Sequence, residues 1–168
     1  MRFRPVWWNV DEAVEPASWT TPSTVQWCRW LLDSYRYWIG QDLIERTGTP
    51  EVQARTLFEA PFVVVSHGVE PDPILNYGNR LALDLWESTW ERLVRTPSRL
   101  TAEPVHRDER ERMLETARSR GFFSDYRGVR ISMTGRRFRI EGACVWTVMD
   151  AQAVRVGQAA SFSQWTRL

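Results

Sequence analysis

The sequence predicts an α+β fold in which helices come first and an antiparallel sheet comes last. Three observations predict it. Residues 23–39 carry apolar side chains at helical spacing, residues 62–67 form a β-branched and aromatic run, and residues 129–149 largely alternate between apolar and polar side chains. Short helical patterns lie between the last two segments. This order of elements is typical of a sheet with helices packed on one face.

Composition indicates one soluble domain and disfavours several classes of function. The chain has 168 residues, of which 43% are hydrophobic and 26% charged, and its net charge is +1. Because this charge is so small, no overall field draws the protein to nucleic acid, and we expect no such partner. The longest apolar run, residues 60–65, is too short to cross a bilayer, so we expect no membrane contact and a cytoplasmic location.

The N-terminus is rich in tryptophan and proline, in a chain that has ten tryptophans and only arginine as its basic residue. Proline breaks helices, yet Trp7, Trp8 and Trp19 are too aromatic for a solvated tail, so this segment would dock on its own domain or on a partner. The chain therefore divides into an arm (residues 1–22), a helical extension (residues 23–59) and the domain that contains the sheet (residues 60–168).

The helical extension begins with an amphipathic helix over residues 23–39. Trp27, Leu31, Tyr35 and Trp38 follow one another at spacings of four, four and three, and Gly40 stands where a glycine C-cap belongs. Two more helical segments are expected, at residues 41–46 and 51–58.

The domain that follows combines short strands with short helices. The expected elements are a strand at residues 62–67, a short strand at 74–77, a helix capped by Asn79, a helix that starts at Ser88 and a charged helix at residues 106–120.

The last third of the chain predicts a three-stranded meander. A strand at residues 129–133 turns at 134–136 into a long strand over 137–149, and residues 154–162 supply the third strand. We expect the even positions of the long strand to share one apolar face. These positions are Phe138, Ile140, Cys144, Trp146 and Val148.

Six separated segments carry a resemblance to a known family. They are Ser66–Gly68, Asp72–Asn79, Pro97–Pro104, Asp125–Ser132, Thr134–Glu141 and Gly157–Ala160. In this order they resemble the MEKHLA family, a PAS-related group, over residues 60–165. The helical region from residue 24 is also similar to the N-terminal helix of that family. The literal Met-Glu-Lys-His-Leu-Ala string is absent, which favours a stand-alone bacterial type.

The resemblance implies a PAS-like fold, which is a five-stranded antiparallel sheet with helices on one face, and a role in sensing or regulated assembly. It does not supply a ligand, because one fold hosts many functions.

Candidate cofactors can be tested against this sequence. A photochemical flavin site of the light-oxygen-voltage type needs a cysteine beside the asparagine–arginine pair that opens the helix, and residues 78–83 contain none. Cys28 and Cys144 lie elsewhere, as two expected buried thiols, so no covalent flavin site is expected. Haem, with His67 or His106 as axial ligand, and non-covalent flavin stay open, whereas no pair of residues has the spacing of a metal site.

An aromatic pocket is expected between the sheet and the short helices, although a core filled with tryptophan explains the same residues. The aromatic candidates are Trp86, Trp90, Tyr126, Phe138 and Trp146. The polar anchors are Asn79, Arg130 and Gln158.

Arginines concentrate on the predicted hairpin. Arginine forks bind carboxylate and phosphate by two-point contacts, so this cluster either holds an anion or pairs with acidic residues on the outer face of the sheet. Its members are Arg127, Arg130, Arg136, Arg137 and Arg139.

The leading hypothesis is a non-enzymatic sensory or regulatory module that binds a small molecule or a partner protein. We expect it to form a homodimer through its N-terminal helix. One alternative is a small enzyme in which His67, Tyr126 or Arg130 supplies acid–base or anion-holding groups. Another is a structural dimerisation domain with a filled core. The sequence identifies neither the ligand nor the partner.

Overall fold

The computed structural model describes residues 20–168, so the arm and its three tryptophans lie almost wholly outside the described residues. The helices are α1 (Pro22–Ile39), α2 (Pro50–Phe58), α3 (Arg80–Trp86), α4 (Trp90–Leu93) and α5 (Pro104–Arg120), with a 3₁₀ helix η3 (Ser98–Thr101) before the last. The strands are β1 (Val63–His67), β2 (Leu75–Gly78), β3 (Phe122–Ile131), β4 (Arg137–Met149), β5 (Arg155–Phe162) and β6 (Gln164–Arg167).

The strands form one antiparallel sheet in the order β2-β1-β5-β4-β3. The short β6 follows β5 directly and pairs with the first half of β4, where β5 has already left the ladder. The predicted α+β class and the five-stranded PAS-like sheet are therefore confirmed, with β6 as an addition.

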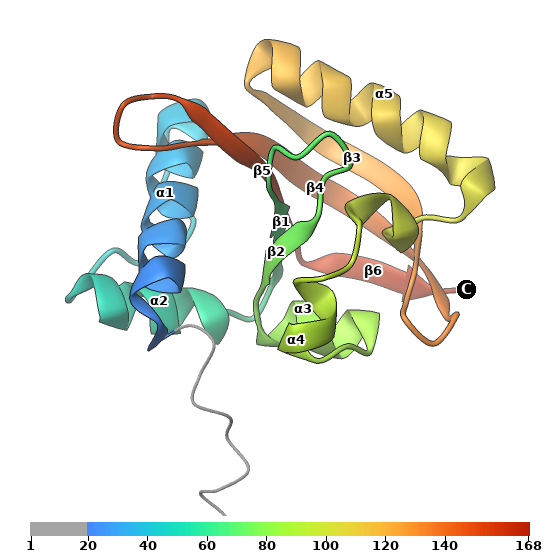
Figure 1. Ribbon diagram of the computed structural model, residues 1–168, viewed down its shortest axis with the longest axis horizontal. Coiled ribbons are helices and arrows are strands. Elements are labelled where there is room, and N and C mark those ends of the chain that lie inside the picture. Colours follow the sequence, from blue (N-terminus) through green and yellow to red (C-terminus); the bar gives the residue numbers. More distant parts are fainter. Residues whose placement is uncertain (1–19) are drawn as a thin grey trace, which may run out of the picture.

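Helices cover both faces of the sheet (Figure 1). The N-terminal extension, α1 and α2, packs on one face in a core that includes Leu31, Leu57 and Trp146. On the other face, α3 and α5 pack in a second core that includes Trp86 and Phe138. The short helix α3 thus lies on one face as expected and the extension on the opposite one, whereas Trp90 of the short helix α4 packs with the first core.

α1 forms for the reasons that its sequence suggested. Thr21 caps its first turn by accepting a hydrogen bond from the Thr24 backbone N–H, and Gly40 ends it in the left-handed conformation at φ 81°. Tryptophan indoles fasten the helix to the sheet: Trp38 donates to the carbonyl of Thr147 at 3.0 Å, and Trp146 donates to the carbonyl of Leu31 at 3.2 Å.

The prediction of a helix at residues 41–46 is wrong, because this segment is an irregular connection. Six residues are too few to offset the cost of nucleating a helix, and Gly40 has already reversed the chain. Side chains bind the connection to its neighbours instead. Asp42 accepts from Arg36 at 2.7 Å, and Arg46 donates to Gln53 at 2.6 Å.

The single even-numbered face expected for β4 is also wrong. Ile140 pairs with Gly128 of β3, but the next pair inward is Ala143 with Tyr126, so β4 has one residue more than β3 in this interval. Gly142 absorbs the extra residue with a φ of 61°, which makes a β-bulge. Before the bulge, Phe138 and Ile140 face α3 and α5; after it, Cys144, Trp146 and Val148 face α1.

Candidate ligand-binding site

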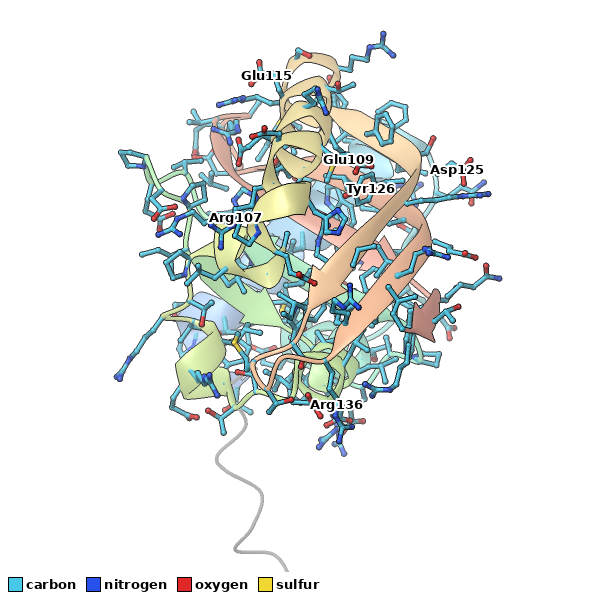
Figure 2. All side chains as sticks on the ribbon, turned by 90° about the vertical axis from the view of Figure 1, so that its right-hand side faces the viewer. Arg107, Glu109, Glu115, Asp125, Tyr126 and Arg136 are labelled. Atoms are coloured by element: carbon cyan, nitrogen blue, oxygen red, sulfur yellow. The ribbon has the colours of Figure 1, made fainter. Side chains whose placement is uncertain are left out.

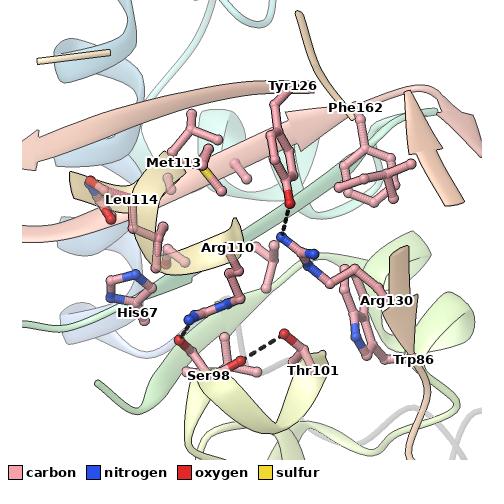
Figure 3. A pocket seen from close by; sticks show the side chains of 18 residues that line it. His67, Trp86, Ser98, Thr101, Arg110, Met113, Leu114, Tyr126, Arg130 and Phe162 are labelled. Carbon is pink, nitrogen blue, oxygen red and sulfur yellow. Dashed lines mark hydrogen bonds between the residues drawn. The ribbon is translucent and has the colours of Figure 1, made fainter. Parts of the chain in front are cut away.

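A small cavity lies between the sheet and α5, with a volume of about 60 Å³ (Figure 3). Its walls come from five of the strands (β1, β2, β3, β4 and β5) and from α3, η3 and α5, and they are mostly aliphatic and aromatic. Polar side chains enter from three sides: Arg130 from β3, Arg110 from α5 and His67 from the end of β1. The cavity is therefore an apolar space with a few placed polar groups, as ligand sites usually are.

The shape of β3 directs Tyr126 and Arg130 into this cavity. The pairing of β3 with β4 shifts on both sides of Tyr126, and Asp125 takes a φ of 56°, so the strand bulges there. Gly128 leaves room for the aromatic ring, because a Cβ at this position would overlap the Tyr126 hydroxyl. Arg130 Nη2 then donates to the Tyr126 hydroxyl at 3.0 Å, and its guanidinium lies 5.3 Å from the ring centroid.

Arg110 reaches the cavity from α5. Its guanidinium donates to the Ser98 hydroxyl of η3 and to Glu111 Oε1, the latter at 3.1 Å. Burial, the larger cause, and the positive charge of Arg130 together lower the pKa of Arg110 to about 10. The two arginines are thus close enough to repel each other inside a largely apolar enclosure.

His67 presents a hydrogen-bond acceptor to the cavity. Its Nδ1 lies 2.8 Å from the carbonyl oxygen of Gly68, which can only accept, so Nδ1 carries the hydrogen. Its Nε2 is buried and has no hydrogen-bond partner among residues 20–168. Burial lowers the pKa of His67 to about 4, so the ring is neutral near pH 7 and Nε2 holds a free lone pair.

Trp86 supplies a second buried group without a partner. Its ring packs edge-on against Phe138 and Phe162, with centroids 5.2 and 6.2 Å away. Its indole Nε1–H makes no hydrogen bond within the described part of the chain. A buried donor of this kind is costly unless something accepts from it.

The structure brings together four of the eight predicted site residues as cavity lining: Trp86, Tyr126, Arg130 and Gln158. Phe138 lies directly behind Trp86. The Gln158 amide donates to the Leu114 carbonyl at 3.0 Å and so ties β5 to α5. The enzymatic alternative, His67 with Tyr126 and Arg130, also lies at the cavity.

The other three predicted residues lie away from the cavity. Trp146 is on the opposite face of the sheet, packed edge-on against Tyr35 at 5.0 Å, because the Gly142 bulge turned it there. Trp90 packs on Tyr77 at 5.7 Å. Asn79 caps α3, accepting from the backbone N–H of Val64 and donating to the carbonyl of Phe62, so its polar groups serve the local fold.

Sequence reasoning missed Arg110, Ser98 and Thr101. The sequence predicts a charged helix at residues 106–120, and many charged side chains of α5 are indeed exposed (Figure 2). Arg110, however, precedes Met113, Leu114 and Ala117 by three, four and seven positions, which places it on the inner side of α5. That spacing was the available signal.

The predicted arginine cluster is divided by the pleat of the sheet. Arg130 points inward, Arg136 pairs with Glu87 at 3.4 Å, and Arg137 pairs with Glu103 at 3.6 Å. Arg127 and Arg139 are exposed. Acid pairing, one of the two interpretations left open above, therefore applies to Arg136 and Arg137, whereas anion holding stays a prediction.

A family model, two curated proteins and several solved structures are similar to this chain. The model of the MEKHLA domain matches residues 25–167. The chain belongs to the MEKHLA domain family. Two curated proteins containing a similar region, both homeobox-leucine zipper protein HOX29 from rice (Oryza sativa subspecies japonica and indica), are 26% identical over 137 residues. The alignment covers 77% of this chain but only 15% of each relative, and the stand-alone bacterial type stays a prediction.

Solved structures similar to this MEKHLA domain share its fold. The PAS domain of a protein from Colwellia psychrerythraea superposes with a TM-score of 0.58 at 12% identity, covering 70% of this chain and 95% of that one. A light-oxygen-voltage domain studied with a flavin analogue gives 0.55 at 13% identity, covering 70% and 84%. An RNA-binding light-oxygen-voltage receptor gives 0.59 at 15% identity, covering 72% and 34%.

Flavin and haem, which the sequence left open, do not fit this cavity. A cavity of about 60 Å³ is far below the roughly 300–1,000 Å³ of pockets that hold drug-sized ligands, so it takes neither flavin nor haem. Cys28 and Cys144 pack in the α1 core, on the other side of the sheet from the cavity. Residues 20–168 also bring no three potential metal ligands together, and none of their helices is long and apolar enough to span a membrane.

Proposed function

We propose that this MEKHLA domain is a non-enzymatic sensory or regulatory module that binds a small molecule between the sheet and α5. The observation that carries the proposal is the cavity itself, which Trp86 and His67 line, because Trp86 Nε1–H and His67 Nε2 are buried without partners among the described residues. Buried polar groups are normally satisfied, so a ligand that pairs with them would recover the free energy that burial costs. The PAS-like fold and the family are consistent with sensing.

Ligand binding can be tested by thermal unfolding of the full chain against a panel of small organic acids, amines, alcohols and amides. We expect at least one compound to raise the melting temperature. Ala160→Leu, which adds a side chain inside the cavity, should abolish that shift. Ala151→Leu, on an exposed turn, should keep it. A compound that stabilises the Ala160→Leu protein as much as the parent would place the site elsewhere and contradict the proposal.

The enzymatic alternative uses the same cavity. His67 has the free lone pair of a general base, and Tyr126 with Arg130 could hold an anion. Its specific support is the unpartnered Nε2 of His67, which a bound ligand would explain equally well. Turnover of a panel compound that is lost in His67→Gln would favour this alternative over a sensor.

A homodimer through the N-terminal helix is the form of assembly that we propose. α1 packs its apolar side on its own sheet, so its outward side would supply the contact. That side is charged, with Arg29, Asp33 and Arg36 exposed. The cytoplasmic location also stays a proposal.

A further inference from the structure

We propose that the cavity binds a small hydroxycarboxylate, with its carboxylate between Arg110 and Arg130 and its hydroxyl on His67. The inference rests on the proposed function, because it names the chemistry of a ligand in the same cavity. It adds a charge, a donor group and a size to that ligand.

The charge follows from the two arginines. Arg110 is 5% exposed and Arg130 is 6% exposed. A buried charge is costly unless an opposite charge accompanies it. Arg130 has no carboxylate within ion-pair distance anywhere in residues 20–168, and the partner of Arg110 is Glu111, whose side chain is 64% exposed and well solvated. The cavity therefore holds an excess of buried positive charge that one anion would balance.

The form of the anion follows from the donors that remain. A guanidinium has five N–H groups in a planar fork that matches a carboxylate. The hydroxyl of Tyr126 accepts from Arg130, so its own hydrogen is free to point at a ligand. The indole N–H of Trp86 is free as well, among the described residues. Figure 3 shows the Arg110 and Arg130 guanidinium groups entering the same space from α5 and β3.

The hydroxyl of the proposed ligand follows from the unpaired acceptor of His67. Its Nδ1–H is used by the Gly68 carbonyl, so the neutral ring offers only an acceptor at Nε2. A carboxylate cannot donate to that lone pair, whereas a hydroxyl on the same ligand can. Together, these groups recognise a molecule that has both an anionic and a donating end.

The size follows from the cavity and its walls. About 60 Å³ holds roughly five water-sized groups. The remaining wall is aliphatic, formed by Val65, Leu75, Met113 and Ile140 among others. A short carbon chain fits this surface, and glycolate, lactate and 3-hydroxybutyrate are suitable probes.

A surface groove offers access to the cavity. It runs between α5 and β3, and two of its lining residues, Met113 and Tyr126, also line the cavity. Tyr126 lies at this border of α5 and β3 (Figure 2). Movement of these two side chains would connect the groove with the cavity.

Isothermal titration of the full chain with these probes tests the proposal. We expect one of the three hydroxy acids to bind, and to bind at least tenfold more tightly than its analogue without the hydroxyl or its neutral amide; for lactate these are propionate and lactamide. Inorganic phosphate and chloride should not compete at equal concentration.

Substitutions locate the two ends of the ligand. Arg130→Met and Arg110→Met should each weaken binding at least tenfold. Arg139→Met, which removes an exposed arginine from the other side of the sheet, should leave it unchanged. His67→Leu should make the hydroxy acid and its unhydroxylated analogue bind equally. The comparison of ligands on the parent protein keeps the test decisive where a variant does not fold.

Several results would overturn the proposal. Tighter binding of propionate, lactamide or phosphate than of lactate would do so. Equal losses of affinity in Arg139→Met and Arg130→Met would do so as well. If no hydroxy acid binds, but a neutral or cationic compound binds and Ala160→Leu abolishes that binding, then the hydroxycarboxylate is wrong and the proposed function stands. If Ala160→Leu changes the binding of no compound, the proposed function itself fails.

Discussion

At the scale of single residues, the cavity brings together buried polar and charged groups that the fold leaves without a full set of partners. Arg110 and Arg130 bring charge, Trp86 brings an unpaired donor and His67 brings an unpaired acceptor, all of them buried. Outside the cavity, three more buried atoms of the described residues lack hydrogen-bond partners: Tyr77 Oη, Glu103 Oε1 and Arg155 Nε. Other buried polar groups are paired. Asn79, for example, satisfies both ends of its amide with backbone groups. The cavity differs in bringing two buried arginines and two unpaired groups to one space, which is an arrangement expected of a functional site.

His67 should make the unliganded protein less stable in mild acid. Burial lowers its pKa from 6.5 to about 4, and among the charges that face it Arg110 and Arg155 act in the same direction and Glu70 opposes them. The unfolded chain therefore takes up a proton that the folded chain excludes. The stabilisation that neutral His67 provides is complete above pH 6.5. The free energy of unfolding should fall by roughly 3 kcal/mol as the pH falls from there to 4.

Urea unfolding at several pH values measures this effect. His67→Gln should flatten the dependence between pH 6.5 and 4, whereas His106→Gln, at a position outside the cavity lining, should keep the parental slope. Parallel curves for the parent and His67→Gln would show that His67 is not the group responsible.

At the scale of elements, β4 serves both layers of the molecule by means of one bulge. The first half of the strand faces α3 and α5 with even-numbered residues, and the second half faces them with Ala143 and Val145. A strand without the bulge would turn Trp146 towards the cavity and away from Tyr35. Gly142 therefore decides which layer receives the largest side chain of the strand.

Gly142→Ala should lower the free energy of unfolding by about 1 kcal/mol, because a φ of 61° is unfavourable for a residue with a Cβ. No atom lies within 4 Å of the added Cβ, so the effect comes from backbone conformation alone. Gly142→Asn, which tolerates this conformation better, should lose less. Urea unfolding that ranks asparagine below alanine would contradict this account.

The elements also show what sequence patterns can and cannot predict. Helical spacing and caps located α1 and α3, and β-branched runs located β1, because these signals are local. The alternation rule failed at Gly142, since one inserted residue reverses every later side chain. Arg110 was missed because its charged neighbours concealed its place on the apolar side of α5, and its contact Ser98 lies on another element, η3, twelve residues earlier.

At the scale of the whole molecule, two helical layers share one sheet. The layer of α3 and α5 encloses the candidate site, and the layer of α1 and α2 closes the other face. This arrangement combines a sheet that the family resemblance implied with an amphipathic helix that the tryptophan spacing predicted. A pocket against the sheet could be predicted, but the wall that α5 and η3 supply could not, because it depends on contacts between elements far apart in the sequence.

Assembly through α1 should respond to salt. Its outward side carries Arg29, Asp33 and Arg36, so a homodimer formed there would be held largely by charged groups. Sedimentation of the full chain should therefore show a dimer at low ionic strength that dissociates as salt is added. A monomer at every ionic strength would contradict the proposed dimer, and a dimer insensitive to salt would place the contact elsewhere.

The hydrogen bond between Trp27 and Ser66 joins α1 to strand β1 of the sheet. Trp27 Nε1 of α1 donates to the Ser66 hydroxyl at 2.9 Å, and Ser66 in turn donates to Asn76 of β2 at 2.7 Å. Ser66 stands in β1 between Val65 and His67, which both line the cavity. A molecule that displaces this stretch of backbone would alter the surroundings of an indole on the far side of the sheet. The protein thus carries its own optical probe, a fluorophore placed behind the wall of the site.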